Sequence, residues 1–304
     1  MDTIVSTNCL TKVYKKERAL DSLTLHVKKG EIYGFIGRNG AGKTTCMKIL
    51  CGLAAPTSGE YSLFGRTGKD VGKMQERIGN LIEMPGLYPN MTAYENLMCK
   101  YIAMGIHRKG YIEEILETVG LGDVGRKKVK KFSLGMKQRL GIGMALLGEP
   151  DLLLLDEPVN GLDPQGIAEI RETVRRLNRE KNITVMISSH ILEELYKVAD
   201  TFGIIHKGTL IQELSRKQLE EKCSDCIKIC LADTRRACIV LEDMGIQNYK
   251  VAAPDTIHVY EMPGRSGEIN LKLSKQGCMV ESIQIVRESL EEYFLELTGG
   301  AANA

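Results

Sequence analysis

Residues 37–44 read GRNGAGKT and directly follow a short apolar run, IYGFI, at residues 32–36. The apolar run predicts a buried β-strand. Three glycines in the loop permit backbone conformations in which successive N–H groups point at one anion: Gly37, Gly40 and Gly42. A helix predicted over residues 43–53 would begin with its positive dipole end at the same place. The segment therefore predicts an α/β fold with a phosphate-binding loop between a strand and a helix.

The side chains of this loop predict a bound nucleotide and a magnesium ion. The spacing G-x-x-x-x-G-K-[ST] places Lys43 to bridge the β- and γ-phosphates and the Thr44 hydroxyl to bind Mg²⁺. Thr45 would add a phosphate contact. The other loop residues would contribute backbone N–H groups: Arg38, Asn39 and Ala41. A chance glycine turn is the alternative, but it does not explain why strand, motif and helix agree.

Four consecutive leucines at residues 152–155 precede Asp156 and Glu157. The leucines predict a buried strand that delivers two carboxylates at its end. In an enzyme with a phosphate loop, Asp156 would hold the Mg²⁺ shell and Glu157 would polarise the attacking water as general base. The alternative is a strand that ends in acidic residues without a function. This alternative does not explain why the acidic pair occurs in the same chain as a phosphate-binding loop.

Length and composition limit the function classes. The chain has 304 residues, enough for about two domains. Its 41 basic and 39 acidic residues give a net charge of +2, so the net charge does not indicate a nucleic-acid partner. The longest apolar runs are far shorter than the roughly 18 residues that span a bilayer, and the start MDTIVSTNCL lacks the features of a signal peptide. We therefore expect a cytoplasmic protein whose role at a membrane is peripheral.

The cysteine pattern favours free thiols over a metal site. Nine cysteines are scattered along the chain, an odd number that argues against a disulfide framework. The one cluster, CSDCIKIC at residues 223–230, has the first half of a zinc spacing without a second pair of ligands nearby. Cys226 and Cys230 are interpreted as strand residues, with metal binding as the alternative. No metal other than Mg²⁺ is predicted.

Hydrophobic periodicity predicts one large domain at residues 1–214. Alternating runs at residues 4–13 and 23–27 fit antiparallel strands. Residues 85–150 predict a helical subdomain, with helices at 93–104, 111–119 and 134–147. Beyond it, strands alternate with helices, which predicts a parallel sheet with covered faces. These strands are expected at 152–155, 183–187, 202–206 and 209–213, and the helices at 164–179 and 191–199.

A second, smaller domain is predicted at residues 215–304. Its strands are expected at 226–231, 248–252, 256–261 and 279–286, and its helices at 234–244, 266–276 and 288–297. The first six elements have the βαββαβ order of a ferredoxin-like α+β domain. No catalytic set of residues is found in it, and GGAANA at residues 299–304 is expected to be a frayed tail.

Between the loop and the acidic pair, residues 132–136 read FSLGM. With the other two motifs, in this order, the chain resembles the nucleotide-binding subunit of an ABC transporter over residues 2–220. FSLGM stands where that family has its LSGGQ signature, with Ser133 and Gly135 retained. The resemblance implies that these two residues and the following helix N-terminus face the γ-phosphate of ATP held by a second copy. An ordinary N-capped helix is the alternative.

Three further residues take roles from the same resemblance. Asp163, which ends the sequence NGLD, matches the D-loop that links the two sites of a dimer, and before Pro164 it would also cap a helix. His190, after the strand at residues 183–187, resembles the switch histidine that contacts the γ-phosphate. Tyr14 lies where the family stacks an aromatic ring on adenine; taken alone, it would be an ordinary strand aromatic.

Glu83 departs from the family pattern, because it occupies the position of the Q-loop glutamine. Glutamine and glutamate have the same reach, so a contact with Mg²⁺ or water is still expected. The added charge beside Asp156 and Glu157 would raise a pKa or weaken metal binding in the ground state. Glu83 together with SLGMKQR resembles the ATP-binding subunits of bacitracin and lantibiotic resistance exporters.

The sequence therefore predicts an ATPase that uses ATP and Mg²⁺ and dimerises head to tail with a second nucleotide-binding subunit, identical or closely homologous. By resemblance, it would drive a separately encoded integral membrane permease from the inner face of the cell membrane and export peptide antibiotics. Another efflux system, for drugs or ions, is an alternative. A soluble ABC ATPase is disfavoured by the single phosphate loop and the lack of long heptad repeats. A GTPase lacks its N-K-x-D motif, and a binding module with an inactive site is the last alternative.

Overall fold

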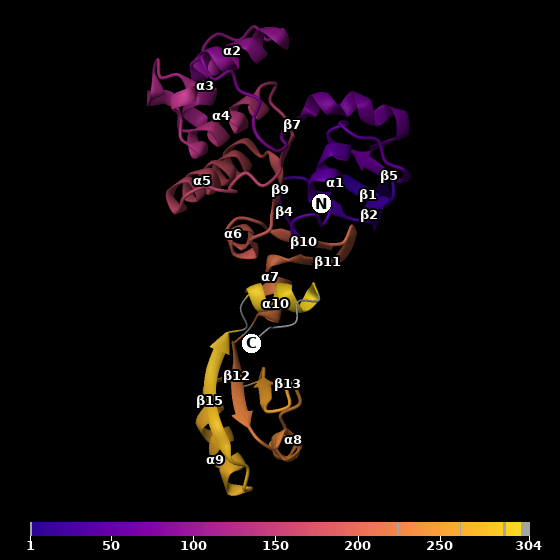
Figure 1. Cartoon of the computed structure of the whole chain (residues 1–304), viewed down its shortest axis with the longest axis vertical. Coiled ribbons are helices and arrows are strands. Elements are labelled where there is room, and N and C mark those ends of the chain that lie inside the picture. The colour runs from indigo at the N-terminus through magenta and orange to yellow at the C-terminus, as the bar shows by residue number, and fades with distance from the viewer. Residues whose placement is uncertain (1, 224, 262, 288–289, 299–304) are drawn as a thin grey trace. The chain divides into compact units, whose positions relative to one another are not determined.

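The computed structural model describes residues 2–223, 225–261, 263–287 and 290–298. The chain divides into two compact units, Met1–Arg216 and Lys217–Ala304 (Figure 1). No helix within the described ranges is long and apolar enough to cross a membrane. The tail predicted at residues 299–304, and the first two residues of the helix predicted at 288–297, lie outside these ranges.

The first unit is built around a six-stranded sheet. Its strands are β4 (Ile32–Ile36), β7 (Ile78–Leu81), β8 (Leu152–Leu155), β9 (Thr184–Ser189), β10 (Thr201–His206) and β11 (Thr209–Ser215). They are ordered β11-β10-β4-β9-β8-β7, with β11 antiparallel and every other pair parallel. Every residue of β4 and β8 is buried, as expected of a parallel sheet covered on both faces. The predicted parallel sheet is confirmed for β8, β9 and β10, whereas the strand predicted at residues 209–213 is the antiparallel β11. β7 is an additional strand that the sequence pattern did not indicate.

Helices α1 (Lys43–Leu50), α5 (Pro164–Lys181) and α6 (Leu192–Tyr196) follow strands of this sheet. α5 and α6 pack against β9. α1 ends three residues before the predicted end, because Gly52 takes a positive φ of 71° and Leu53 N bonds back to Lys48 O at 2.8 Å. Such a glycine-closed turn terminates a helix.

A helical segment is inserted between β7 and β8. It contains α2 (Ala93–Ala103), α3 (Tyr111–Thr118) and α4 (Leu134–Leu146), which pack on one another (Figure 1). A capping box between Thr92 and Glu95 starts α2. The three helices predicted here are confirmed, each ending within a residue of its expected end. Three 3₁₀ segments complete the connections of the unit: Gly68–Arg77, Gly122–Val124 and Val129–Lys131.

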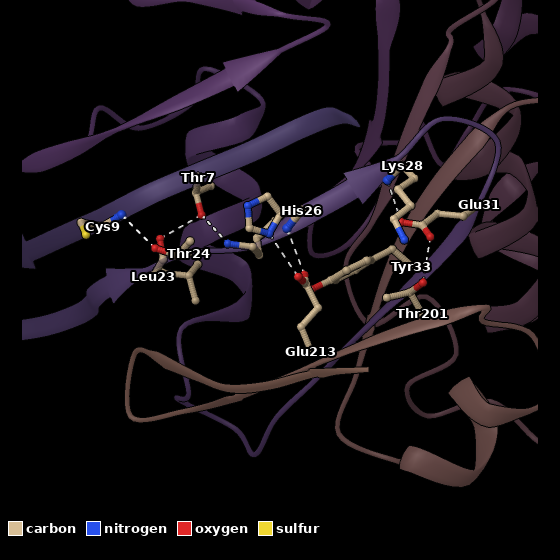
Figure 2. Close-up of polar contacts among 11 residues, drawn as sticks. Thr7, Cys9, Leu23, Thr24, His26, Lys28, Glu31, Tyr33, Thr201 and Glu213 are labelled. Carbon is tan, nitrogen blue, oxygen red and sulfur yellow. Dashed lines mark hydrogen bonds and ion pairs between the residues drawn. The ribbon is translucent and has the colours of Figure 1, made fainter. Parts of the chain in front are cut away.

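An antiparallel sheet forms the other part of this unit. It contains β1 (Thr3–Tyr14), β2 (Glu17–Leu23), β3 (His26–Lys28), β5 (Ser58–Leu63) and β6 (Arg66–Thr67). The prediction of one strand at residues 23–27 is wrong, because β2 and β3 pair with different halves of β1. The Thr7 hydroxyl lies at the break, where it donates to Leu23 O at 2.8 Å and accepts from Leu25 N at 3.0 Å. Figure 2 shows Thr7 and Leu23 at this break.

A polar junction connects the two sheets (Figure 2). The Glu213 carboxylate on β11 accepts hydrogen bonds from the Tyr33 hydroxyl on β4 at 2.7 Å and from the His26 backbone N–H on β3 at 2.9 Å. Burial and the nearby Glu213 carboxylate raise the pKa of Tyr33 well above its ordinary value, so the hydroxyl stays a proton donor. The junction fixes the antiparallel sheet to the strand that leads into the phosphate loop.

The second unit contains a four-stranded antiparallel sheet in the order β13-β14-β12-β15. Its strands are β12 (Asp225–Leu231), β13 (Tyr249–Ala253), β14 (Thr256–Val259) and β15 (Val280–Arg287). Its helices are α8 (Thr234–Asp243), α9 (Ser266–Lys275) and α10 (Leu290–Leu297), while α7 (Arg216–Lys222) spans the division between units. Ile227 and Ile229 of the sheet, Leu241 of α8 and Leu273 of α9 belong to one core. Both Cys226 and Cys230 lie on β12, which confirms their prediction as strand residues.

Replacing Gly203 with alanine is expected to destabilise the first unit. A Cβ atom there would lie 2.1 Å from the Tyr33 hydroxyl oxygen, which is held by Glu213. Overpacking of this kind costs about 1–3 kcal/mol, so the midpoint of urea unfolding should fall. Gly72→Ala is the matched control, because nothing lies within 4 Å of its Cβ position. Equal midpoints for the two variants would contradict the close packing.

Candidate active site

The phosphate loop, residues 37–44, lies between β4 and α1 and is fixed by backbone contacts. Gly37 N donates to Ser189 O at 3.3 Å, and Gly208 N donates to Ala41 O at 2.9 Å. Gly42 has a φ of 109°, and a Cβ atom on it would lie 2.5 Å from Ala19 O, so only glycine fits. α1 starts without a side-chain cap, the arrangement that suits anion binding at a helix N-terminus.

Lys43 is almost fully buried inside the loop, with 5% of its side chain exposed. Its Nζ donates to Gly37 O at 2.5 Å and to Arg38 O at 3.3 Å, and forms an ion pair with Glu157 Oε1 at 3.0 Å. An ammonium group removed from water needs such partners. The structure therefore brings the loop lysine and the predicted general base into direct contact.

Asp156 connects the loop to the neighbouring strands. Its Oδ2 accepts a hydrogen bond from Thr44 Oγ1 at 2.7 Å, and its Oδ1 accepts one from Ser188 Oγ at 2.6 Å. Hydroxyl and carboxylate oxygens side by side are the ligands that hard divalent cations prefer. Thr44 and Asp156 can therefore hold such a cation.

Glu157 is held in an uncommon backbone conformation, with a φ of 49°. Its carboxylate lies between two cationic or proton-donating groups, 3.0 Å from Lys43 Nζ and 2.8 Å from His190 Nδ1. The structure thus places Lys43, Glu157 and His190 in one contiguous group, as the sequence motifs indicated.

Ser188 is a site residue to which no sequence motif assigns a role. Its hydroxyl is fully buried, accepts a hydrogen bond from Glu157 N at 2.9 Å and donates to Asp156 Oδ1. One side chain therefore fixes the two acidic residues relative to each other. The available signal was its position at the carboxyl end of a buried strand, just before His190.

Glu83 contacts a lysine of α1 and not the other carboxylates. Its side chain is 64% exposed, and its Oε1 lies 2.6 Å from Lys48 Nζ. Among the described residues no hydrogen bond joins Glu83 to Asp156 or Glu157. Lys48 belongs to no motif, and nothing in its local sequence marks it as a site residue.

Ser133 and Asp163 cap helices, as their sequence contexts predict. Ser133 Oγ accepts from Met136 N at 3.2 Å, and Asp163 Oδ1 accepts from Gly166 N at 3.0 Å. The two caps are neighbours, because a Cβ atom on Gly135 would lie 3.7 Å from Gly166 Cα. Within the described part of the chain, no hydrogen bond or ion pair joins them to the phosphate loop.

The other predicted residues lie on accessible parts of the site. Tyr14, at the end of β1, is 45% exposed, and Lys12 Nζ lies 4.8 Å from its ring centroid. Arg38 and Asn39 are exposed in the loop, and Thr45 is half-buried in the first turn of α1. These side chains are free to contact a ligand that enters from solvent.

Known proteins share both the sequence and the fold. The ABC transporter family model matches residues 20–160. The bacitracin transport ATP-binding protein BcrA of Bacillus licheniformis is 46% identical over 302 residues, which cover 99% of each chain. The chain belongs to the ABC transporter ATP-binding proteins. The lantibiotic transport ATP-binding protein SrtF of Streptococcus pyogenes is 46% identical over 206 residues, 67% of this chain and 87% of that protein.

A solved structure agrees with this family assignment. The dimeric post-hydrolysis structure of the ATP-binding cassette MJ0796, bound to ADP and Pi, has a TM-score of 0.63 and 25% identity. The match covers 70% of this chain and 99% of that one. The predicted ABC cassette fold is thereby confirmed. As an ABC ATP-binding subunit, the chain binds and hydrolyses ATP.

Replacing Ser188 with alanine is expected to lower ATP hydrolysis about 10- to 100-fold. Asp156 and the Glu157 N–H would each lose a hydrogen bond that orients them. Ser189→Ala is the matched control, because its hydroxyl accepts from Ile191 N and is bonded to neither carboxylate. Steady-state phosphate release measures both variants. Equal rates for the two would show that Ser188 does not organise the site.

Proposed function

We propose that this ABC ATP-binding subunit energises a separate membrane permease that exports peptide antibiotics of the bacitracin or lantibiotic type. The observation that carries the proposal is the extent of the likeness to BcrA. A cassette common to all ABC transporters would explain similarity in the first unit alone. The similarity continues through the second unit, Lys217–Ala304, which supports a shared task for the whole chain.

The contacts of the site support a division of roles during ATP hydrolysis. Lys43 would bridge the β- and γ-phosphates, and Thr44 and Asp156 would hold Mg²⁺, which offsets the phosphate charge when bound. When a phosphate binds the Lys43 ammonium group in place of Glu157, the Glu157 carboxylate remains bonded to His190. Glu157 Oε1 is then available to accept a proton from the attacking water. Occupation of the loop would therefore prepare its own general base.

The remaining site residues would orient the nucleotide. The backbone of Gly37, Arg38, Asn39, Gly40, Ala41 and Gly42, with the Thr45 hydroxyl, would surround the phosphates. The exposed ring of Tyr14 would stack on adenine, and His190 would contact the γ-phosphate. Glu83 would contact Mg²⁺ or the water around it.

We further propose a head-to-tail dimer with a second copy or a close homologue. Ser133 is exposed and Gly135 half-buried, so the N-terminus of α4 is accessible to another chain. In the described ranges, these residues and Asp163 make no hydrogen bond or ion pair with their own phosphate loop, which fits a role in completing a partner's site. The relative MJ0796 was solved as a dimer.

In this proposal the subunit lies on the inner face of the cell membrane as a peripheral partner of the permease. Residues 1–214 form the nucleotide-binding domain, with a helical subdomain at about 85–150, and residues 215–304 form an accessory α+β domain. A ferredoxin-like arrangement of the latter is supported by its βαββαβ order and its antiparallel strand order β13-β14-β12-β15.

Glu157→Gln is expected to lower kcat about 10²- to 10⁴-fold while ATP binding persists, because the amide cannot accept the water proton. ATP-loaded dimers should therefore accumulate. Phosphate release and light scattering after size exclusion measure the two effects. Glu172→Gln is the control, since that carboxylate is exposed on α5. A wild-type turnover rate in Glu157→Gln would refute the role of Glu157 as general base. A Glu157→Gln variant that stays monomeric in the presence of ATP would refute the proposed dimer.

Affinity purification from detergent-solubilised membranes of the native host is expected to recover an integral membrane permease with this subunit. Cells that lack the subunit should become more sensitive to a bacitracin- or lantibiotic-type peptide. Wild type should restore resistance, whereas Lys43→Ala should not, because it removes the phosphate-binding ammonium group. Sensitivity to other drugs alone would favour a different efflux system, and absence of a permease would favour a soluble ATPase.

A further inference from the structure

Glu83 and Glu157 occupy equivalent places on neighbouring strands. β7 and β8 are parallel with Leu81 opposite Leu155, and each glutamate comes two residues after the last residue of its strand. Both have left-handed backbone conformations, with φ of 62° and 49°. Such conformations are uncommon for residues other than glycine and are concentrated at functional sites. The two carboxylates are therefore delivered in the same manner to the same edge of the sheet.

Each of these carboxylates is paired with a lysine of α1. Lys43, the first residue of the helix, lies 3.0 Å from Glu157, and Lys48, in its last turn, lies 2.6 Å from Glu83. The hydrogen bond with Glu83 raises the pKa of Lys48, and the charge of Asp156 acts in the same direction. Lys48 thus lies in the field of both Glu83 and Asp156.

We infer that Lys48 is a positioning residue for Glu83, which fixes the place of its carboxylate at this edge of the sheet and balances its charge. The inference rests on the proposed use of this edge as the phosphate site. A glutamine at position 83 would need no such partner, whereas a glutamate adds a third carboxylate to Asp156 and Glu157. A free carboxylate near a polyphosphate opposes binding by Coulomb repulsion, which is stronger where water is partly excluded. Lys48 offsets that charge.

An ordinary surface ion pair is the competing explanation. The Lys48 side chain is 35% exposed, and exposed pairs contribute little to stability. Two observations favour the positioning role. Glu83 has a left-handed backbone conformation, which an ion pair on the surface does not require. Lys48 also lies one helical turn after Thr44, on the same face of α1 as the residue that bonds Asp156.

The test measures the affinity of the full chain for ATP in EDTA, so that Mg²⁺ does not enter the readout. Lys48→Met is expected to weaken ATP binding about fivefold to tenfold, because Glu83 loses its partner and repels the phosphates. In a Glu83→Gln background the same substitution should change the dissociation constant less than about twofold, since the interacting charge is gone. Lys48→Arg keeps the ion pair and should bind ATP as the wild type does.

Lys181→Met is the matched control, because it removes a similarly exposed ion pair, with Glu114, elsewhere in the first unit. It should leave ATP affinity unchanged. Thermal unfolding verifies that each variant is folded, and Lys48→Gln serves as a second neutral variant.

Two outcomes overturn the inference and leave the proposed function intact. Equal weakening by Lys48→Met in both backgrounds would mean that Lys48 acts on the nucleotide directly. Unchanged affinity in every variant would mean that the pair is a surface contact only. A wild-type chain that binds no ATP, with or without Mg²⁺, would instead overturn the proposed function and this inference with it.

Discussion

The site depends on the parallel alignment of β4, β9 and β8, which are neighbours in the sheet. Because parallel strands end at one edge, the segments that follow them meet there. The register sets Ile36 opposite Ser189 and Leu155 opposite Ile187. A slip of one residue would move a strand end by about 3.3 Å. That displacement would break the 2.6 Å hydrogen bond between Ser188 and Asp156, on which the position of both acidic residues depends.

Charge compensation is the second requirement at this edge. Lys43 is buried and would be costly without Glu157 and the loop carbonyl groups beside it. Helix α1 supplies both cations, Lys43 and Lys48, and also the Thr44 hydroxyl that bonds Asp156. A single short helix therefore sets the electrostatic balance of the site.

Local sequence predicts much of this structure, because motifs with fixed spacing and buried apolar runs carry their own signal. The strand before the loop, the leucine strand β8 and the caps Ser133 and Asp163 are all found as expected. The strands and site residues that the sequence does not predict depend on long-range pairing. The break between β2 and β3 depends on the Thr7 hydroxyl, and the four residues of β7 are a strand only because β8 pairs with them. The roles of Ser188 and Lys48 become visible only through contacts with residues that are distant in sequence.

The position of β4 in the sheet has a consequence for biosynthesis. It ends at Ile36, yet its two neighbours, β9 and β10, begin at Thr184 and Thr201. The hydrogen bond from His26 to Glu213 joins residues 187 positions apart. Contacts of such long range form late in folding. During synthesis, the N-terminal part of the chain leaves the ribosome first. The apolar strand β4 therefore has neither neighbour to pair with until most of the first unit has been synthesised, and a nascent chain stopped before β9 lacks Ser188 and His190.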